Sequence, residues 1–341
     1  MTFALKNKFL IFMLIVSGAL ASASSRILDE TILAEKYKQW MVQHGRTYEM
    51  KEEENMRFEI FKKNLEYIEN FNNMGNQTYK LSTNEYADLT NEEFLAYYAG
   101  YKIFPSKISF KTKRFKYENL TNVPASIDWR KKGAVTQIKD QGACGSCWAF
   151  SAVAAVEGVI KIKTGQLFSL SEQQLVDCAR IHKTQGCYGG WMDDAFEYIV
   201  KNHGLAKETK YPYTSKDGNC SHRKAAVRAV QINGYEDVPH KDEEALLKAA
   251  SQQPVSVCLN SKGPEFQFYS GGVFTGPCGT SLNHAVAIVG YGKSEDGTKY
   301  WLIKNSWGKS WGESGYMRIK RDVASKKGLC GIAKKSSYPV A

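Results

Sequence analysis

The stretch QGACGSCWAF, residues 141–150, places two cysteines three positions apart at the start of a predicted helix. Ser146 is a suitable N-cap for this helix, which we expect to end near Gly165. A Cys-x-x-Cys pair can be half of a zinc site, a thioredoxin-type redox pair, part of two separate disulfides, or a nucleophile beside a structural cysteine. The rest of the chain has to distinguish these alternatives.

The remaining sequence favours the nucleophile. A zinc site needs four ligands, and the chain has no second Cys-x-x-Cys and no closely spaced histidine pair. A redox pair would need strand–helix–strand alternation, which is not seen around residues 144–147. A helix N-terminus lowers the pKa of a thiol from about 8.5 toward neutrality, and Cys147 directly follows the predicted N-cap. His284, in LNHAVAIVGYG, and Asn305, in IKNSWG, are candidates for the proton carrier and its orienting group.

Composition sets the broad class of the protein. The 341 residues are 43% hydrophobic, which is enough for two or three compact units with real cores. The formal charge of +11 is spread over single residues and pairs, without a basic stripe or a base-stacking module. We therefore expect no nucleic-acid partner.

The N-terminus predicts a signal peptide over residues 1–23. Lys6 and Lys8 precede the apolar run FLIFMLIV, and Ala21 and Ala23 form an A-x-A cleavage site. The run is shorter than the roughly 20 residues that cross a membrane, so we expect a chain without a membrane span. Passage through the secretory pathway permits disulfides and glycosylation. The candidate glycosylation sites are Asn76, Asn119 and Asn219.

Residues 24–122 differ from the rest of the chain. They contain no cysteine, and residues 52–73 have helical periodicity, with an apolar stripe that includes Met56, Phe61, Leu65 and Ile68. Residues 106–122 are basic and have no clear period, as expected of a connector. All eight cysteines follow it. This contrast predicts a pro-segment, and an ordinary N-terminal helical domain is the alternative.

Residues 123–341 predict an α+β body with helices first and strands later. Ser171 and Gln174 form a capping box for SEQQLVDC. We expect further helices in WMDDAFEYIVKNHG, closed by Gly204, and in DEEALLKAASQ. The expected strands are PVSVCLN, NHAVAIVGYG, KYWLIKNSW and GYMRIKRD.

The motifs CGSCWAF, NHAV and NSWG, in that order, resemble those of the papain-like cysteine proteases, most closely the plant type. The pro-segment resembles the inhibitory helix of that family at Glu53, Arg57, Phe61, Asn64, Ile68 and Asn72. The resemblance implies a two-lobed fold preceded by a helical pro-domain. The helical left lobe would span about 123–232 and the β-barrel-like right lobe about 233–341, with the chain ends crossing over.

The resemblance also assigns roles to residues. Cys147 would attack as a thiolate paired with the His284 imidazolium, Asn305 would orient His284, and Gln141 would be the oxyanion donor. Trp307 would shield the His–Asn hydrogen bond. Gly189 and Gly190 would leave room for the substrate backbone to pair as an added strand.

The pocket for the second substrate side chain follows from the same resemblance, and we expect it to prefer apolar residues. Its lining would be Trp191, Met192, Cys258, Leu282, Ala285 and, at its base, Lys335. A lysine is unusual at that position, and we expect it to extend to solvent because burying an unpaired ammonium is costly. The implied disulfides are Cys144–Cys187, Cys178–Cys220 and Cys278–Cys330. Besides the nucleophile, only Cys258 is then left unpaired.

The sequence thus predicts a cysteine endopeptidase made as an inactive zymogen, without a metal or other cofactor. A catalytically idle storage or binding member of the family, and an exopeptidase, are the alternatives. The first would be expected to lack one of the site residues, and the second would need an extra segment that blocks the cleft.

One pro-segment motif departs from the usual pattern at Ser82 and Tyr86, which weakens the expectation of acid-triggered release. We expect a monomer in a vacuole-like compartment or outside the cell, acting on proteins or peptides. Its pro-segment and cystatin-type proteins would inhibit it.

Overall fold

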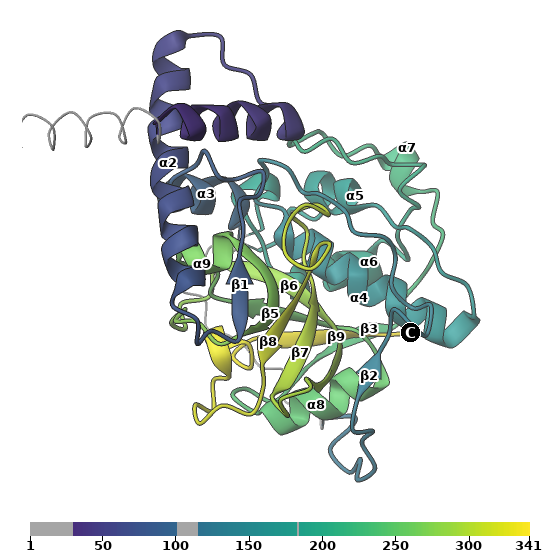
Figure 1. The fold of residues 1–341 in the computed structure, drawn as a ribbon. Coiled ribbons are helices and arrows are strands. Elements are labelled where there is room, and N and C mark those ends of the chain that lie inside the picture. The colour runs from purple at the N-terminus through teal and green to yellow at the C-terminus, as the bar shows by residue number, and fades with distance from the viewer. Residues whose placement is uncertain (1–29, 101–114, 183) are drawn as a thin grey trace, which may run out of the picture. The chain divides into compact units, whose positions relative to one another are not determined.

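The computed structural model describes residues 30–100, 115–182 and 184–341 (Figure 1). The chain divides into two compact units, residues 1–67 and residues 68–341. The predicted signal peptide and part of the basic connector lie outside the described residues. No helix in the described ranges is long and apolar enough to cross a membrane.

The first unit is a pair of packed helices. Residues 30–44 are helical, and α2 (Lys51–Asn73) supplies the partner before it continues into the second unit. The rings of Tyr37 and Trp40 both lie 5.2 Å from Phe61, which is almost fully buried. Met56 is 49% exposed, so its expected place on the buried stripe is wrong. The first helix covers the face of α2 that carries Phe61, and Met56 lies outside that contact.

The second unit begins with the end of α2, followed by β1 (Tyr79–Leu81) and α3 (Asn91–Tyr98). The Asn72 side chain bonds to both backbone groups of Leu81 and so holds β1 against α2. Thr90 and Glu93 form a capping box that starts α3. β1 then pairs antiparallel with β5 of the body.

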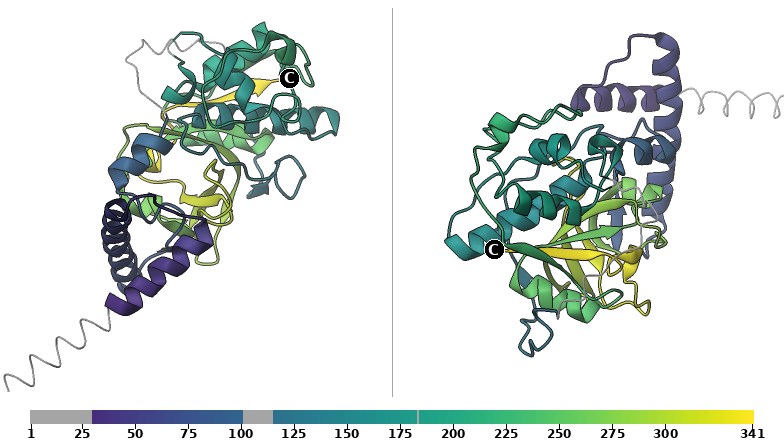
Figure 2. Two further views of the ribbon diagram at one scale, coloured as in Figure 1. Left: turned by 90° about the horizontal axis from the view of Figure 1, so that it is seen from above. Right: turned by 180° about the vertical axis from the view of Figure 1, so that it is seen from behind.

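The central helix of the body is α4 (Cys147–Thr164), against which α5 (Glu172–Cys178) and α6 (Met192–Lys201) pack. The other helices are α7 (His222–Ala225), α8 (Glu243–Gln252) and α9 (Pro264–Gln267), with short 3₁₀ turns η1 (Gly186–Tyr188) and η2 (Leu329–Gly331). Every residue of α4 from Cys147 to Ile160 is buried, because α5, α6 and strands of the sheet contact this helix on several sides (Figure 2).

The predicted helices are present, and three details differ. α4 ends at Thr164 as predicted, with Gly165 as its C-cap at a left-handed φ of 75° that favours glycine, but α6 ends at Lys201, three residues before Gly204. Ser146 occupies the N-cap of α4, but its hydroxyl bonds to the hydroxyl of Tyr213 at 2.6 Å and caps nothing. Ser171 does accept from the backbone of Gln174, whose own side chain bonds elsewhere.

The strands form one mixed sheet. They are β2 (Ile127–Asp128), β3 (Gly234–Asp237), β4 (Val255–Leu259), β5 (Tyr269–Phe274), β6 (His284–Lys293), β7 (Lys299–Lys304), β8 (Tyr316–Lys320) and β9 (Ser336–Val340), together with β1. Their order is β1-β5-β8-β7-β6-β4-β9-β3, and β2 pairs with β6 off this path. The barrel-like form implied by the resemblance is therefore not realised as a closed barrel among the described strands, because β1 and β3 end the path on opposite sides.

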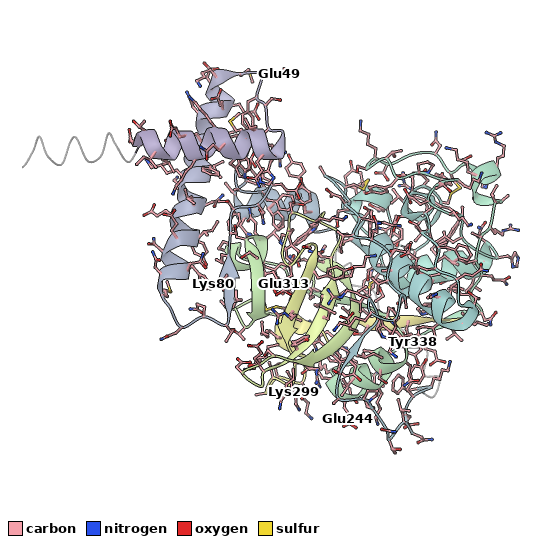
Figure 3. The ribbon with its side chains drawn as sticks, turned by 45° about the vertical axis from the view of Figure 1, so that its right-hand side comes forward. Glu49, Lys80, Glu244, Lys299, Glu313 and Tyr338 are labelled. Atoms are coloured by element: carbon pink, nitrogen blue, oxygen red, sulfur yellow. A yellow bond between two sulfur atoms is a disulfide. The ribbon has the colours of Figure 1, made fainter. Side chains whose placement is uncertain are left out.

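Long-range contacts join the ends of the body to its centre. β2 pairs with β6, and β9 contacts both α4 and α6. At the other side of the sheet the Glu313 carboxylate bonds to Arg318 and to the backbone of Gly272 (Figure 3). Disulfides link Cys144 to Cys187, Cys178 to Cys220 and Cys278 to Cys330, the three pairs that the resemblance implies. Cys147 and Cys258 are outside these disulfides, and both are buried.

Candidate active site

Cys147 is the first residue of α4 and lies against the start of β6. Its Sγ accepts a hydrogen bond from the backbone N–H of Ala285 at 3.4 Å. The fold thus brings the N-terminus of the central helix to the residue that follows His284, although the two are far apart in the sequence.

His284 is oriented by Asn305. The imidazole Nε2 lies 2.8 Å from the Asn305 Oδ1, which also accepts from the backbone of Ser306 at 2.9 Å. Since that oxygen is an acceptor in both bonds, Nε2 carries the proton, and Nδ1 keeps its lone pair. Nδ1 is buried without a hydrogen-bond partner among the described residues. The Trp307 ring stacks on the imidazole at 4.3 Å and is itself fully buried, which keeps water from the His–Asn bond.

Gln141 is fixed by its surroundings with its amide N–H groups facing the Cys147 region. Its Oε1 accepts from the Ser306 hydroxyl at 2.6 Å, and its Nε2 donates to the Cys144 carbonyl at 2.9 Å. Ser306 was not singled out from the sequence, although it lies inside the NSWG motif. The Cys144 carbonyl can only accept, so it fixes the Gln141 amide with its N–H groups on that side, and the Ser306 hydroxyl donates to the amide oxygen.

The segment that precedes the body covers this site. The Tyr98 carbonyl accepts from Gln141 Nε2 at 3.1 Å and from Trp307 Nε1 at 3.4 Å. A Cβ added to Gly100 would collide with the Gly145 carbonyl oxygen, so only glycine allows the backbone to approach this closely. α3 supports the segment, because Phe94 is fully buried with its ring 4.8 Å from Trp307.

This cover changes the charge state expected at the site. Burial raises the pKa of the Cys147 thiol to about 11, although backbone N–H groups of Ala285 and Gly100 offset part of the shift. Burial also lowers the pKa of His284 to about 4, and the bond to Asn305 offsets this only partly. The predicted thiolate–imidazolium pair is therefore disfavoured in this covered state, because no water solvates the two charges.

The glycines of the cleft rim have a packing role. A Cβ on Gly190 would lie 2.7 Å from both the Trp148 ring and the Thr184 methyl, so glycine is required by the layer beneath. Gly189 has a φ of 116°, and its carbonyl accepts from the backbone of Gln185. From the sequence, these glycines are expected only to leave room for a substrate.

The expected pocket residues meet in one apolar cluster. Met192, Cys258, Leu282 and Ala285 are all buried in it, and Trp191 packs against it. The Cys258 Sγ lies 3.1 Å from the Met192 Sδ.

The expectation that Lys335 extends to solvent is wrong. Its side chain is 4% exposed, and its Nζ lies 2.5 Å from Asp193 Oδ2 and 2.6 Å from Asp237 Oδ1. Two carboxylates supply the partners whose absence would have made burial costly. Neither aspartate could be assigned to Lys335 from the sequence, because they lie on α6 and β3, far from it in the chain.

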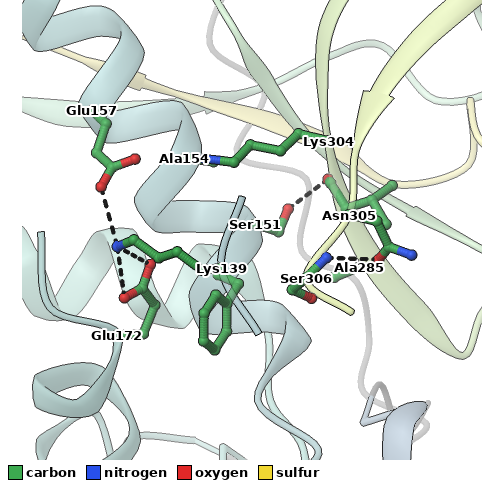
Figure 4. Close-up of a pocket in the computed structure, with 11 residues that line it drawn as sticks. Lys139, Ser151, Ala154, Glu157, Glu172, Ala285, Lys304, Asn305 and Ser306 are labelled. Atoms are coloured by element: carbon green, nitrogen blue, oxygen red, sulfur yellow. Dashed lines mark hydrogen bonds and ion pairs between the residues drawn. The ribbon is translucent and has the colours of Figure 1, made fainter. Parts of the chain in front are cut away.

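A cluster of buried charges lines a small cavity behind Asn305 and Ser306 (Figure 4). Lys139 Nζ bonds to both oxygens of Glu172 at 2.7 and 2.9 Å and to Glu157 at 3.4 Å. Burial by itself lowers the pKa of Lys139, but the two carboxylates outweigh it and raise this pKa above its ordinary value. The cluster joins α4 and α5 to β7, whose Lys304 bonds to Thr136.

One group of described residues could hold a metal ion by the nature of its ligands. Atoms of His182, Asp194 and Glu197 lie within 4.8 Å of one another; Asp194 and Glu197 are on α6, and His182 is in the loop before it. Glu197 already pairs with Lys201 at 2.6 Å, and Asp194 accepts from Thr184 at 2.5 Å. These bonds account for the arrangement without a metal.

Comparison with known proteins identifies the family. Residues 123–340 match the model of the papain family cysteine proteases, and residues 37–94 match the cathepsin propeptide inhibitor domain I29. The senescence-specific cysteine protease SAG12 of Arabidopsis thaliana is 52% identical over 338 residues, which cover 97% of each chain. Vignain of Vigna mungo is 51% identical over 92% of this chain and 86% of its own.

Solved structures agree with this result. The proform of the ragweed pollen cysteine protease Amb a 11 has a TM-score of 0.84 at 46% identity, covering 90% of this chain and 94% of its own. The recombinant stem bromelain precursor has a TM-score of 0.82 at 47% identity, with 90% and 98% covered. The chain therefore belongs to the papain family of cysteine proteases and carries that family's I29 inhibitory propeptide domain.

Proposed function

We propose that Cys147 is the nucleophile of this protease and that His284 is its proton carrier. The observation that supports the proposal is the path of the segment that ends at Gly100: its Tyr98 carbonyl accepts from Gln141 and Trp307, and its Gly100 backbone N–H bonds to Cys147. In the proposal, the carbonyl oxygen of a scissile peptide bond accepts from Gln141 in the same way.

In the proposed reaction the thiol proton passes to His284 Nδ1, which has no other partner among the described residues. The Cys147 sulfur then attacks the substrate carbonyl carbon, and the oxyanion is stabilised by Gln141 Nε2 and the backbone N–H of Cys147. His284 returns the proton to the leaving amine, and water hydrolyses the acyl-enzyme. Asn305 needs only to orient the imidazole, since its bond to Nε2 persists throughout.

Purified enzyme from the full chain, activated in acid, provides the test. Cys147→Ala should abolish cleavage of a fluorogenic peptide, whereas Glu244→Gln, at an exposed position on α8, should retain turnover. Cleavage by Cys147→Ala at a rate near that of the unmodified enzyme would refute the assignment.

We also propose that cleavage near Val123 releases residues 24–122 and leaves 123–341 as the mature enzyme. The supporting observation is that residues 121, 122 and 124–126 are exposed, whereas Tyr117 just before them is anchored to Gln253 and to the Tyr338 ring. N-terminal sequencing after incubation at about pH 4–5 should find a start at or near Val123. A start before residue 110 would contradict the proposal.

Acid would loosen the pro-segment by protonating carboxylates that accept bonds across its contact with the body. Glu85, for example, accepts from Ser310 at 2.6 Å. A protonated carboxyl is a weaker acceptor and carries no charge, so this contact weakens as the pH falls.

The remaining proposals concern the setting of the enzyme. Residues 1–23 would direct the chain into the secretory pathway, toward a vacuole-like compartment or the cell exterior. Asn76, Asn119 and Asn219 are exposed, which supports their use as glycosylation sites. We further propose a monomer that cystatin-type proteins inhibit, and a substrate pocket that prefers an apolar second residue.

A further inference from the structure

We propose that Asp193 and Asp237 are positioning residues for substrate specificity. They hold the Lys335 ammonium away from the second-residue pocket, so that the pocket selects apolar side chains and gives acidic ones no partner. The inference rests on the proposed function, because it takes Met192, Cys258, Leu282 and Ala285 as the pocket wall.

The backbone places Lys335 directly behind that wall. Its carbonyl accepts from the backbone N–H of Cys258 at 2.9 Å, and Cys258 touches Met192. Asp193 is the next residue after Met192 on α6, and Asp237 ends β3, which pairs with β9. The ammonium thus lies near the pocket in the fold, and the two carboxylates decide where it points.

The two contacts are close enough to hold the ammonium firmly. They measure 2.5 and 2.6 Å, and the Asp193 and Asp237 side chains are only 19% and 13% exposed. Burial by itself lowers the pKa of Lys335, but the charges of Asp193 and Asp237 outweigh it and raise this pKa. Lys335 is therefore charged throughout the working pH range of the enzyme, and the two aspartates compensate its charge.

The charges around the Lys335 ammonium disfavour the binding of an acidic substrate side chain. One ammonium faces two carboxylates, and Tyr235 on β3 is neutral because burial raises its pKa. A glutamate entering the pocket would meet a net negative charge and a lysine whose bonds are already made. Burial of that glutamate without a partner is costly.

The test compares two peptide substrates that differ only in glutamate or leucine at the second position. It uses enzyme activated from the full chain and is run at pH 6.5, where the substrate glutamate is charged. Active enzyme is counted with a covalent thiol inhibitor. Asp193→Asn and Asp237→Asn each remove one charge with little change in shape, and Glu197→Gln is the matched control on α6.

Each asparagine variant should raise the ratio of kcat/KM for glutamate over leucine by at least about tenfold, because the freed ammonium can pair with the substrate. High salt should reduce the gain. Adding Lys335→Met to Asp193→Asn should abolish it, and Glu197→Gln should leave the ratio within about twofold. A general structural defect would instead lower kcat/KM for both substrates together.

An unchanged ratio in both asparagine variants, with leucine cleavage retained, would overturn the inference. Lys335→Met alone provides a second test that does not depend on those variants folding. It should leave the ratio within about threefold of the unmodified enzyme. A tenfold fall in kcat/KM for the glutamate peptide would show that Lys335 already binds the substrate side chain in the unmodified enzyme. If the unmodified enzyme cleaves neither peptide, the proposed function itself fails.

Discussion

Replacing Phe94 by alanine should uncover Cys147 without unfolding the body. Phe94 is fully buried on α3, and its ring lies 4.8 Å from Trp307 and 5.1 Å from Tyr86. Truncation of a buried phenylalanine costs about 3–5 kcal/mol. In the open state the pro-segment has left Cys147, and the Phe94 contact is lost. If the substitution destabilises the covered state by about 3 kcal/mol, the fraction of molecules in the open state should rise roughly 10²-fold.

The assay is alkylation of the intact chain at pH 8, with modification of each cysteine followed by mass spectrometry. In the covered state the Cys147 thiol is buried and protonated, so it reacts only through the open state. Its rate should therefore rise about 10²-fold in Phe94→Ala. Tyr97→Ala, at a 52% exposed position on the same helix, should change the rate by no more than about twofold.

Cys258 serves as the internal reference. It is fully buried in the apolar cluster of the body, so its alkylation reports opening of the body rather than of the segment. Two results would refute the reasoning. Cys147 could react no faster in Phe94→Ala than in Tyr97→Ala, or the rates of Cys147 and Cys258 could rise together.

Three further predictions concern the active site and the charges behind it. Gln141→Ala should lower kcat by about 10²-fold, the scale of one lost oxyanion donor, and loss of less than threefold in steady-state kinetics would contradict its role. In the covered chain, the rate of Cys147 alkylation should increase with pH up to about 11, because burial raises the pKa of the thiol. After activation, the rate should reach its plateau at a much lower pH. Identical pH profiles before and after activation would contradict the inference that the pro-segment covers Cys147. Glu157→Gln should lower the free energy of unfolding at pH 7 by about 3 kcal/mol, because it removes one of the two carboxylates that compensate the charge of the partly buried Lys139. A change below about 1 kcal/mol in urea unfolding, with Glu244→Gln at an exposed position on α8 as the control, would show that the cluster is not stabilising.

The sequence by itself determined the family, the candidate nucleophile and most of the regular structure. Motifs such as CGSCWAF and NSWG are local, and the strands with β-branched runs, β4 and β6, are evident from composition. Strands such as β9 were missed, because SSYPV contains a proline and has no alternation that marks it as a strand. Its place in the sheet depends on β4 and β3, which are distant in the chain.

Only the tertiary structure decided the environment of each chemical group. The Tyr98 carbonyl accepts from the Gln141 amide, and the Ser306 hydroxyl donates to the oxygen of that amide, in both cases through contacts between distant segments. Lys335 is the clearest case. From the sequence alone a buried lysine has no visible partner, so exposure is the better expectation. The fold brings Asp193 and Asp237 to it, and their charges reverse that balance, because the cost of burying an ion depends on which ions lie beside it.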